Sequence, residues 1–136
     1  MSPHTFTRRV EFGDTDLAGI MHFANFFRFM EAAETDFLRQ RGLSVSWSEN
    51  GVKHGFPRVS VSCDFQKPAK FEDLLAVTVT VENVGRKSVT YRFDFNRDGV
   101  ALAVGRMTSV FCRDNGMVGM EALPIPAEIR TKLGAV

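Results

Sequence analysis

One segment of the sequence combines the length of a long helix with an apolar face too broad to be left in water. Apolar side chains recur at helical spacing between residues 23 and 41, and polar side chains fall on the opposite side. Gly42 follows directly, and glycine readily takes the left-handed conformation that ends a helix. The pattern predicts a largely buried helix over residues 23–41, roughly 28 Å long. Its apolar stripe consists of Phe26, Phe29, Met30, Ala33 and Phe37.

Most of the remaining chain alternates between apolar and polar side chains, which is the pattern of half-buried strands. Such segments cover residues 5–12, 59–66, 75–82, 89–96 and, less regularly, 100–112. Short polar, glycine-containing links connect the last three segments, and links of this kind favour hairpins. We therefore predict a single α+β domain over residues 1–136, in which an antiparallel sheet of about five strands wraps around the one long helix.

Two details of the strand pattern predict how the elements pack. The first strand is expected to place Phe12 on its apolar face. Small residues at Ala101, Ala103 and Gly105 indicate that the last strand closely approaches the helix. A short helix over residues 127–133 follows two prolines near the end of the chain.

Composition excludes several classes of partner. Seventeen basic and sixteen acidic side chains leave a net charge of +1, so neither nucleic acid nor an anionic membrane is expected as a partner. The cysteines, Cys63 and Cys112, are far apart in strand-like segments and are expected to be small buried residues. We find no signal peptide and no apolar run long enough to span a bilayer, so a cytoplasmic location is expected. An exposed sheet edge in so small a domain favours a homo-oligomer.

Two carboxylates stand in a tight turn immediately before the predicted helix. Asp14 and Asp16 lie between Gly13 and Gly19, a few residues from the helix N-terminus. The first turn of a helix has free backbone N–H groups and a partial positive charge. A carbonyl bound there would meet a hydrogen-bond donor on its oxygen and a carboxylate near its carbon. This arrangement is suited to acyl transfer or hydrolysis.

The same stretch carries a family resemblance. The residues from Val10 to Asp16, with Ala18-Gly19-Ile20 and Phe23-Ala24-Asn25, resemble the opening motif of the 4-hydroxybenzoyl-CoA thioesterase family. Members of that family are acyl-CoA thioesterases with the hotdog fold. Element order, length and a second, weaker motif at residues 85–88 extend the resemblance over the whole chain. It implies a homodimer or homotetramer of hotdog domains with active sites at subunit interfaces.

The resemblance also assigns roles to particular residues. Asp16 occupies the position of the catalytic carboxylate, and Phe23 the position whose backbone N–H polarises the thioester carbonyl. The turn that contains Arg86, Lys87 and Ser88 is similar to the one that meets the phosphates of CoA.

Other polar residues near these positions have two interpretations each. Asn25 either contacts the substrate or organises the helix start, and His22 either lines the pocket or is structural. Asp14 is expected to be the structural member of the acidic pair. Some other hotdog thioesterases use a carboxylate on the central helix, so Glu31 and Glu34 are alternatives to Asp16 that could border the acyl pocket.

The leading prediction is an acyl-CoA thioesterase that releases a carboxylic acid and free CoA. Asp16 would act as nucleophile or general base, and no metal or organic cofactor is needed. The chain lacks Gly-x-Ser-x-Gly, Cys-x-x-Cys and His-Glu-x-x-His motifs, so a serine-hydrolase elbow and a metal site are not expected. The alternatives are a hotdog 3-hydroxyacyl-thioester dehydratase that pairs His22 with Asp16, and a non-catalytic acyl-thioester-binding module. The identity of the acyl group is left open.

Overall fold

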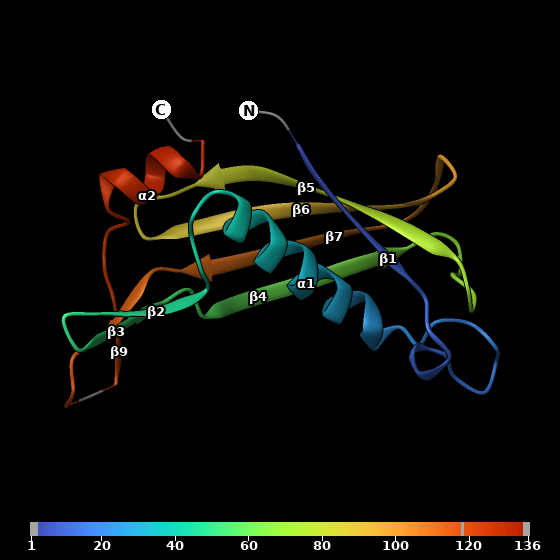
Figure 1. Cartoon of the computed structure of the whole chain (residues 1–136), viewed down its shortest axis with the longest axis horizontal. Helices are drawn as coiled ribbons and strands as arrows, with labels where there is room; N and C mark the ends of the chain where they lie inside the picture. The colour runs from blue at the N-terminus through green and yellow to red at the C-terminus, as the bar shows by residue number, and fades with distance from the viewer. Residues whose placement is uncertain (1–2, 118, 135–136) are drawn as a thin grey trace.

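A five-stranded antiparallel sheet holds one long helix, α1 (Ala24–Gln40), against one of its faces (Figure 1). The computed structural model describes residues 3–117 and 119–134. The strand order in this sheet is β1-β5-β6-β7-β4. The five strands are β1 (His4–Arg9), β4 (Arg58–Phe65), β5 (Leu74–Val84), β6 (Ser88–Arg97) and β7 (Val100–Val110). Fold class and helix are therefore confirmed, and the fold is that of a hotdog domain.

The predicted apolar stripe of α1 forms the centre of the core. All five of its residues are at most 3% exposed. Gly105 of β7 lies directly beneath the helix, where an added Cβ would come within 2.6 Å of the sulfur of Met30. Ala103 is also buried on this strand, whereas Ala101 is exposed. The predicted close approach of this strand to the helix is confirmed at Gly105. The prediction is wrong for Ala101, which is exposed and is not buried beneath the helix.

The first strand ends earlier than its alternation predicts. β1 stops at Arg9, and Phe12 lies in a short 3-10 turn, η1 (Phe12–Asp14), where it is 78% exposed. The turn forms because Glu11 and Asp14 bond to each other's backbone in a capping box. The prediction that Phe12 is buried is therefore wrong, since local capping overrides the continued alternation.

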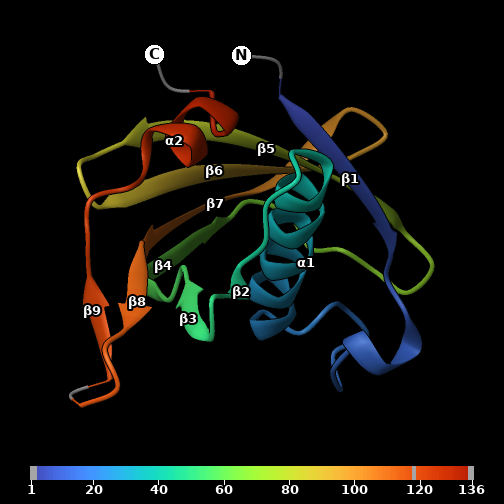
Figure 2. The ribbon, with the colours of Figure 1, turned by 60° about the vertical axis from the view of Figure 1, so that its left-hand side comes forward.

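A second, smaller sheet, which adjoins the start of β4 and the end of β7, was not predicted (Figure 2). It has the order β2-β3-β8-β9, from β2 (Ser46–Glu49), β3 (Val52–Gly55), β8 (Cys112–Asp114) and β9 (Met120–Ala122). The predicted strand over 100–112 is divided, because β7 ends at Val110 and Cys112 begins β8. Strands of three or four residues are too short to show alternation. The final helix, α2 (Ala127–Lys132), was expected.

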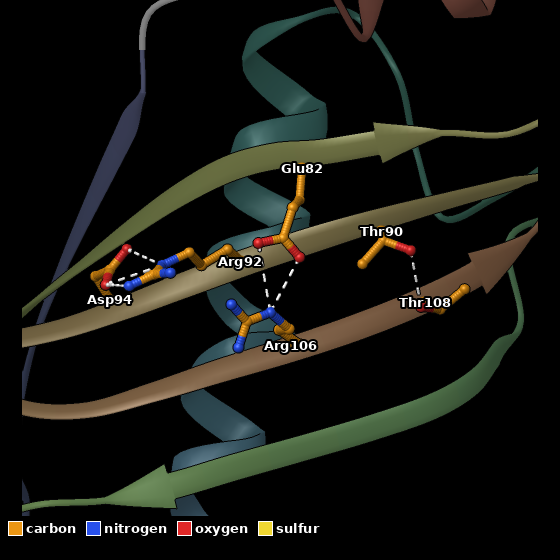
Figure 3. A network of polar contacts seen from close by, with 6 residues as sticks. All are labelled: Glu82, Thr90, Arg92, Asp94, Arg106 and Thr108. Carbon is orange, nitrogen blue, oxygen red and sulfur yellow. Dashed lines mark hydrogen bonds and ion pairs between the residues drawn. The ribbon is translucent and has the colours of Figure 1, made fainter.

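The face of the main sheet that points away from α1 is polar (Figure 3). Arg92 bonds to Asp94 on the same strand, and Arg106 bonds to Glu82 with a shortest N–O distance of 3.0 Å. This alternation of apolar and polar faces explains the regular pattern of the central strands. Among the described residues, no helix is long and apolar enough to cross a bilayer.

The cysteines differ in environment. Cys112 is buried, as expected, whereas Cys63 on the edge strand β4 is only half-buried. Burial and the neighbouring Asp64 raise the pKa of the Cys63 thiol to about 11, so this thiol is protonated at neutral pH.

Candidate active site

Asp14 closes the turn of the loop before α1 through its side chain and ties the loop to the helix start through its backbone carbonyl. Its carboxylate accepts a hydrogen bond from the Glu11 N–H at 2.8 Å. Its carbonyl oxygen accepts two more, from the His22 N–H and from the Asn25 side-chain amide, each at 2.8 Å. Asp14 and Asn25 thus hold the loop in place, and Asn25 fits the role of organising the helix start.

Asp16 lies on a tight turn within this loop and is exposed. The turn closes through hydrogen bonds from the Asp16 N–H to the Ile20 carbonyl and from the Gly19 N–H to the Asp16 carbonyl. Gly19 has φ of +81°, a conformation that side chains disfavour. One carboxylate oxygen of Asp16 accepts the Ala18 N–H at 2.9 Å. The other oxygen bonds to none of the described residues and can face a substrate.

The helix start offers one free backbone donor. The Ala24 N–H donates to Nδ1 of His22 at 3.1 Å, and the Asn25 N–H donates to the His22 carbonyl. No hydrogen bond to a described residue uses the Phe23 N–H. Unpaired N–H groups at a helix N-terminus carry partial positive charge and suit a developing oxyanion.

His22 works as part of this helix start. Because its Nδ1 accepts a hydrogen bond, the neutral ring carries its proton on Nε2. Its ring also stacks on Phe23, with centroids 4.6 Å apart. These contacts fit a structural role, and they leave Nδ1 unavailable as a base.

Asp16 and Phe23 border one pocket of about 370 Å³. One wall is formed by the loop and the first turns of α1, including Met21 and the buried Phe26. The other wall is formed by the end of β4 and the segment that follows it, residues 65–68. A second hollow of about 540 Å³ opens on the other side of the loop and is also bordered by Asp16. Asp16 therefore stands between two hollows, of which the smaller is also lined by Phe23.

Neither of the two helix carboxylates, Glu31 and Glu34, lines this pocket. Glu34 is fully buried and bonds to Arg58 and, at 3.4 Å, to the Ser109 hydroxyl. Burial raises the pKa of Glu34, and the Arg58 guanidinium partly offsets that effect. Glu31 is exposed, 4.0 Å from Arg58. Sequence reasoning missed this buried pair because Arg58 is 24 residues from Glu34.

Within one chain, the turn with Arg86, Lys87 and Ser88 and the Asp16 loop lie at opposite ends of the main sheet. β5 begins next to the Asp16 loop, since Leu74 pairs with Arg9, and then runs 11 residues to the turn. At about 3.3 Å per residue this separation is roughly 35 Å. The C-terminal segment orders the turn, because Arg130 donates to the Gly85 carbonyl at 2.8 Å. A single chain therefore does not bring the turn to Asp16.

A metal site is not evident in the described part of the chain. Within residues 3–117 and 119–134, no three His, Cys, Asp or Glu side chains gather in a way that could hold an ion.

The sequence matches the Thioesterase-like superfamily over residues 10–133, which includes the loop, α1 and every strand of the main sheet except β1. The chain belongs to this superfamily. As predicted from the opening motif, it is a thioester hydrolase with the hotdog fold.

Known members of this superfamily support the same assignment. The 4-hydroxybenzoyl-CoA thioesterase of Pseudomonas sp. strain CBS-3 is 33% identical over 96 residues, which are 68% of this chain and 67% of that protein. Its solved structure superimposes with a TM-score of 0.83 at 27% identity, covering 96% of this chain and 98% of that one. A 1,4-dihydroxy-2-naphthoyl-CoA hydrolase of Thermosynechococcus vestitus is 31% identical over 89% of this chain and 82% of its own length.

Proposed function

We propose that the chain hydrolyses acyl-CoA thioesters at the Asp16 loop. The observation that carries the proposal is that Asp16 and Phe23 line the same largely apolar pocket, and that the Phe23 N–H donates to none of the described residues. The carboxylate supplies a nucleophile or base, and the N–H supplies the donor that a developing oxyanion requires.

A thioester carbonyl in this pocket would accept the Phe23 N–H on its oxygen. In one route, Asp16 attacks the carbonyl carbon, the C–S bond breaks, CoA leaves as the thiolate, and water then hydrolyses the mixed anhydride. In the other route, Asp16 takes a proton from water while the water oxygen adds to the carbonyl carbon. The C–S bond then breaks, and the leaving CoA thiolate takes up the proton that Asp16 holds. Both routes end in a carboxylic acid, CoA and a regenerated carboxylate.

The test is release of thiol from a panel of aromatic and aliphatic acyl-CoAs. Turnover of at least one ester, with CoA and free acid in equal amounts, is the expected result. Addition or loss of water with the thioester intact would instead identify a dehydratase, and binding without turnover would identify a non-catalytic module. Against the dehydratase stands the structural role of His22, whose Nδ1 accepts the Ala24 N–H.

We further propose that two copies pair through β4 and so complete the site. β4 is an edge strand, and it leaves Val59 and Val61 exposed by 62% and 46% although both are apolar. If β4 pairs antiparallel with its copy about a two-fold axis, the start of β4 in one subunit lies beside the end of β4 in the other. The β5–β6 turn of the partner subunit would then lie at the same end as Asp16, within the reach of a CoA molecule.

Replacement of Val61 by lysine tests the dimer. Val61 is near the middle of β4, so the two-fold axis would bring two lysines together and like charges would repel. We expect a shift from dimer to monomer in analytical ultracentrifugation, loss of activity and an unchanged far-UV CD spectrum. Thr5 is exposed on the opposite edge strand, β1, and replacing it by lysine should change neither the oligomeric state nor the activity. A Val61→Lys protein that remains a fully active dimer would contradict this arrangement.

Arg86→Ala tests the proposed phosphate contact. Loss of a charge-assisted hydrogen bond to phosphate should raise KM by about tenfold, with a smaller change in kcat. The same substitution should have no effect on N-acetylcysteamine thioesters, which lack the nucleotide. Steady-state kinetics with both substrate types checks this, and an unchanged KM for acyl-CoA would rule out the contact.

A further inference from the structure

The pocket bordered by Asp16 contains one cation, Lys67, on the wall that faces the helix start. The wall formed by residues 65–68 consists of Phe65, Gln66, Lys67 and Pro68. Among the described residues, none forms an ion pair with the Lys67 side chain. The remaining lining, apart from Asp16 and Gln66, is apolar.

The backbone holds this wall in place. The N–H groups of Gln66 and Lys67 both donate to the Leu102 carbonyl, at 2.8 and 3.1 Å. The next carbonyls are also engaged, because Arg97 donates to Pro68 and the Met21 N–H donates to Ala69 at 2.7 Å. Lys67 is therefore presented from a fixed segment, opposite the loop that carries the proposed reacting groups.

We propose that Lys67 determines substrate specificity by binding an anionic group on the acyl chain, so that acyl groups with a carboxylate are preferred. This inference rests on the proposed function. A thioester carbonyl at Asp16 and Phe23 directs its acyl group into the pocket whose other wall carries Lys67 and the Gln66 amide. An ammonium and an amide together satisfy a carboxylate that would otherwise lose its hydration in an apolar cavity.

The location of Lys67 argues for an anion on the acyl group instead of the phosphates of CoA. A pocket of about 370 Å³ accommodates an acyl group, whereas the phosphates lie beyond a long pantetheine arm. The nearby Lys70 provides a matched control, since it is exposed like Lys67 but does not line this pocket.

The experiment compares pairs of CoA esters that differ only in one charged group: 4-carboxybenzoyl against 4-methylbenzoyl, and glutaryl against valeryl. In the Lys67→Met variant, the ratio of kcat/KM between the charged and neutral ester should fall by about tenfold to a hundredfold. Lys67→Arg should retain most of the ratio, Lys67→Glu should lower it further, and Lys70→Met should leave it unchanged.

Two results would overturn the inference. The ratio of kcat/KM could stay constant, either because neither ester is affected or because activity falls equally for both, as it would if Lys67 only balanced the charge of Asp16. The effect could also disappear with N-acetylcysteamine thioesters, which would assign Lys67 to the CoA phosphates. Absence of thiol release from every ester would refute the proposed function itself, whereas Asp16-dependent release without charge discrimination would refute only the role of Lys67.

Discussion

Asp16→Asn should lower kcat by about a hundredfold to ten-thousandfold, the range typical of a lost general base. Asparagine has nearly the same shape and can still accept the Ala18 N–H, but it neither attacks a carbonyl nor takes a proton from water. Because Asp16 is exposed, thermal unfolding of the variant should match that of the wild type. Thiol release under saturating acyl-CoA measures the effect.

Asp14→Asn is the matched control, because it removes a carboxylate two residues away in the same loop. The Asp14 side chain accepts the Glu11 N–H, and an asparagine oxygen can keep that bond. Activity should therefore remain close to that of the wild type. If Asp16→Asn retains full turnover, or if Asp14→Asn loses as much as Asp16→Asn, the catalytic assignment is wrong.

Arg58→Met should cause the largest loss of stability. It leaves the fully buried carboxylate of Glu34 with only the Ser109 hydroxyl as a partner. Removing one member of a buried ion pair costs about 3 kcal/mol or more, which corresponds to a fall in Tm of roughly 10 °C for a domain of this size. Arg106→Met is the control, since its pair with Glu82 is largely solvent-exposed and is worth about 1 kcal/mol at most.

The pH dependence of this effect has a defined sign. The pKa of Glu34 is raised by burial, and loss of the nearby cation should raise it further. A carboxyl whose pKa is higher in the folded than in the unfolded state binds its proton more tightly when folded, so its contribution favours folding at low pH and is lost as the pH rises through the folded pKa. The deficit of Arg58→Met should thus be smaller at about pH 5 than at about pH 8.

Chemical denaturation at both pH values measures this dependence. The double variant Glu34→Leu/Arg58→Met should recover much of the lost stability at neutral pH, because no charge then remains in the core. A deficit that grows on acidification would contradict the assignment to Glu34.

Local pattern was sufficient to determine the central elements of this protein. The apolar stripe of α1 and the alternation in β5 and β6 each depend on side chains a few residues apart, and burial selects for those periods. The turn before the helix could also be predicted from local pattern, because its acidic residues and glycines lie within seven residues of one another, from Gly13 to Gly19. Through its resemblance to the family's opening motif, this compact segment predicts Asp16 and Phe23 as site residues.

Contacts between distant segments were decided only by the tertiary structure. The second sheet is built from strands too short to show a period, and Phe12 is exposed because a capping box ends β1 early. The pairing of Glu34 with Arg58, the position of Lys67 opposite the Asp16 loop and the distance of Arg86 from that loop all depend on how separate elements pack. Local sequence patterns do not predict such contacts, because burial and hydrogen bonding between distant segments depend on how the whole chain folds.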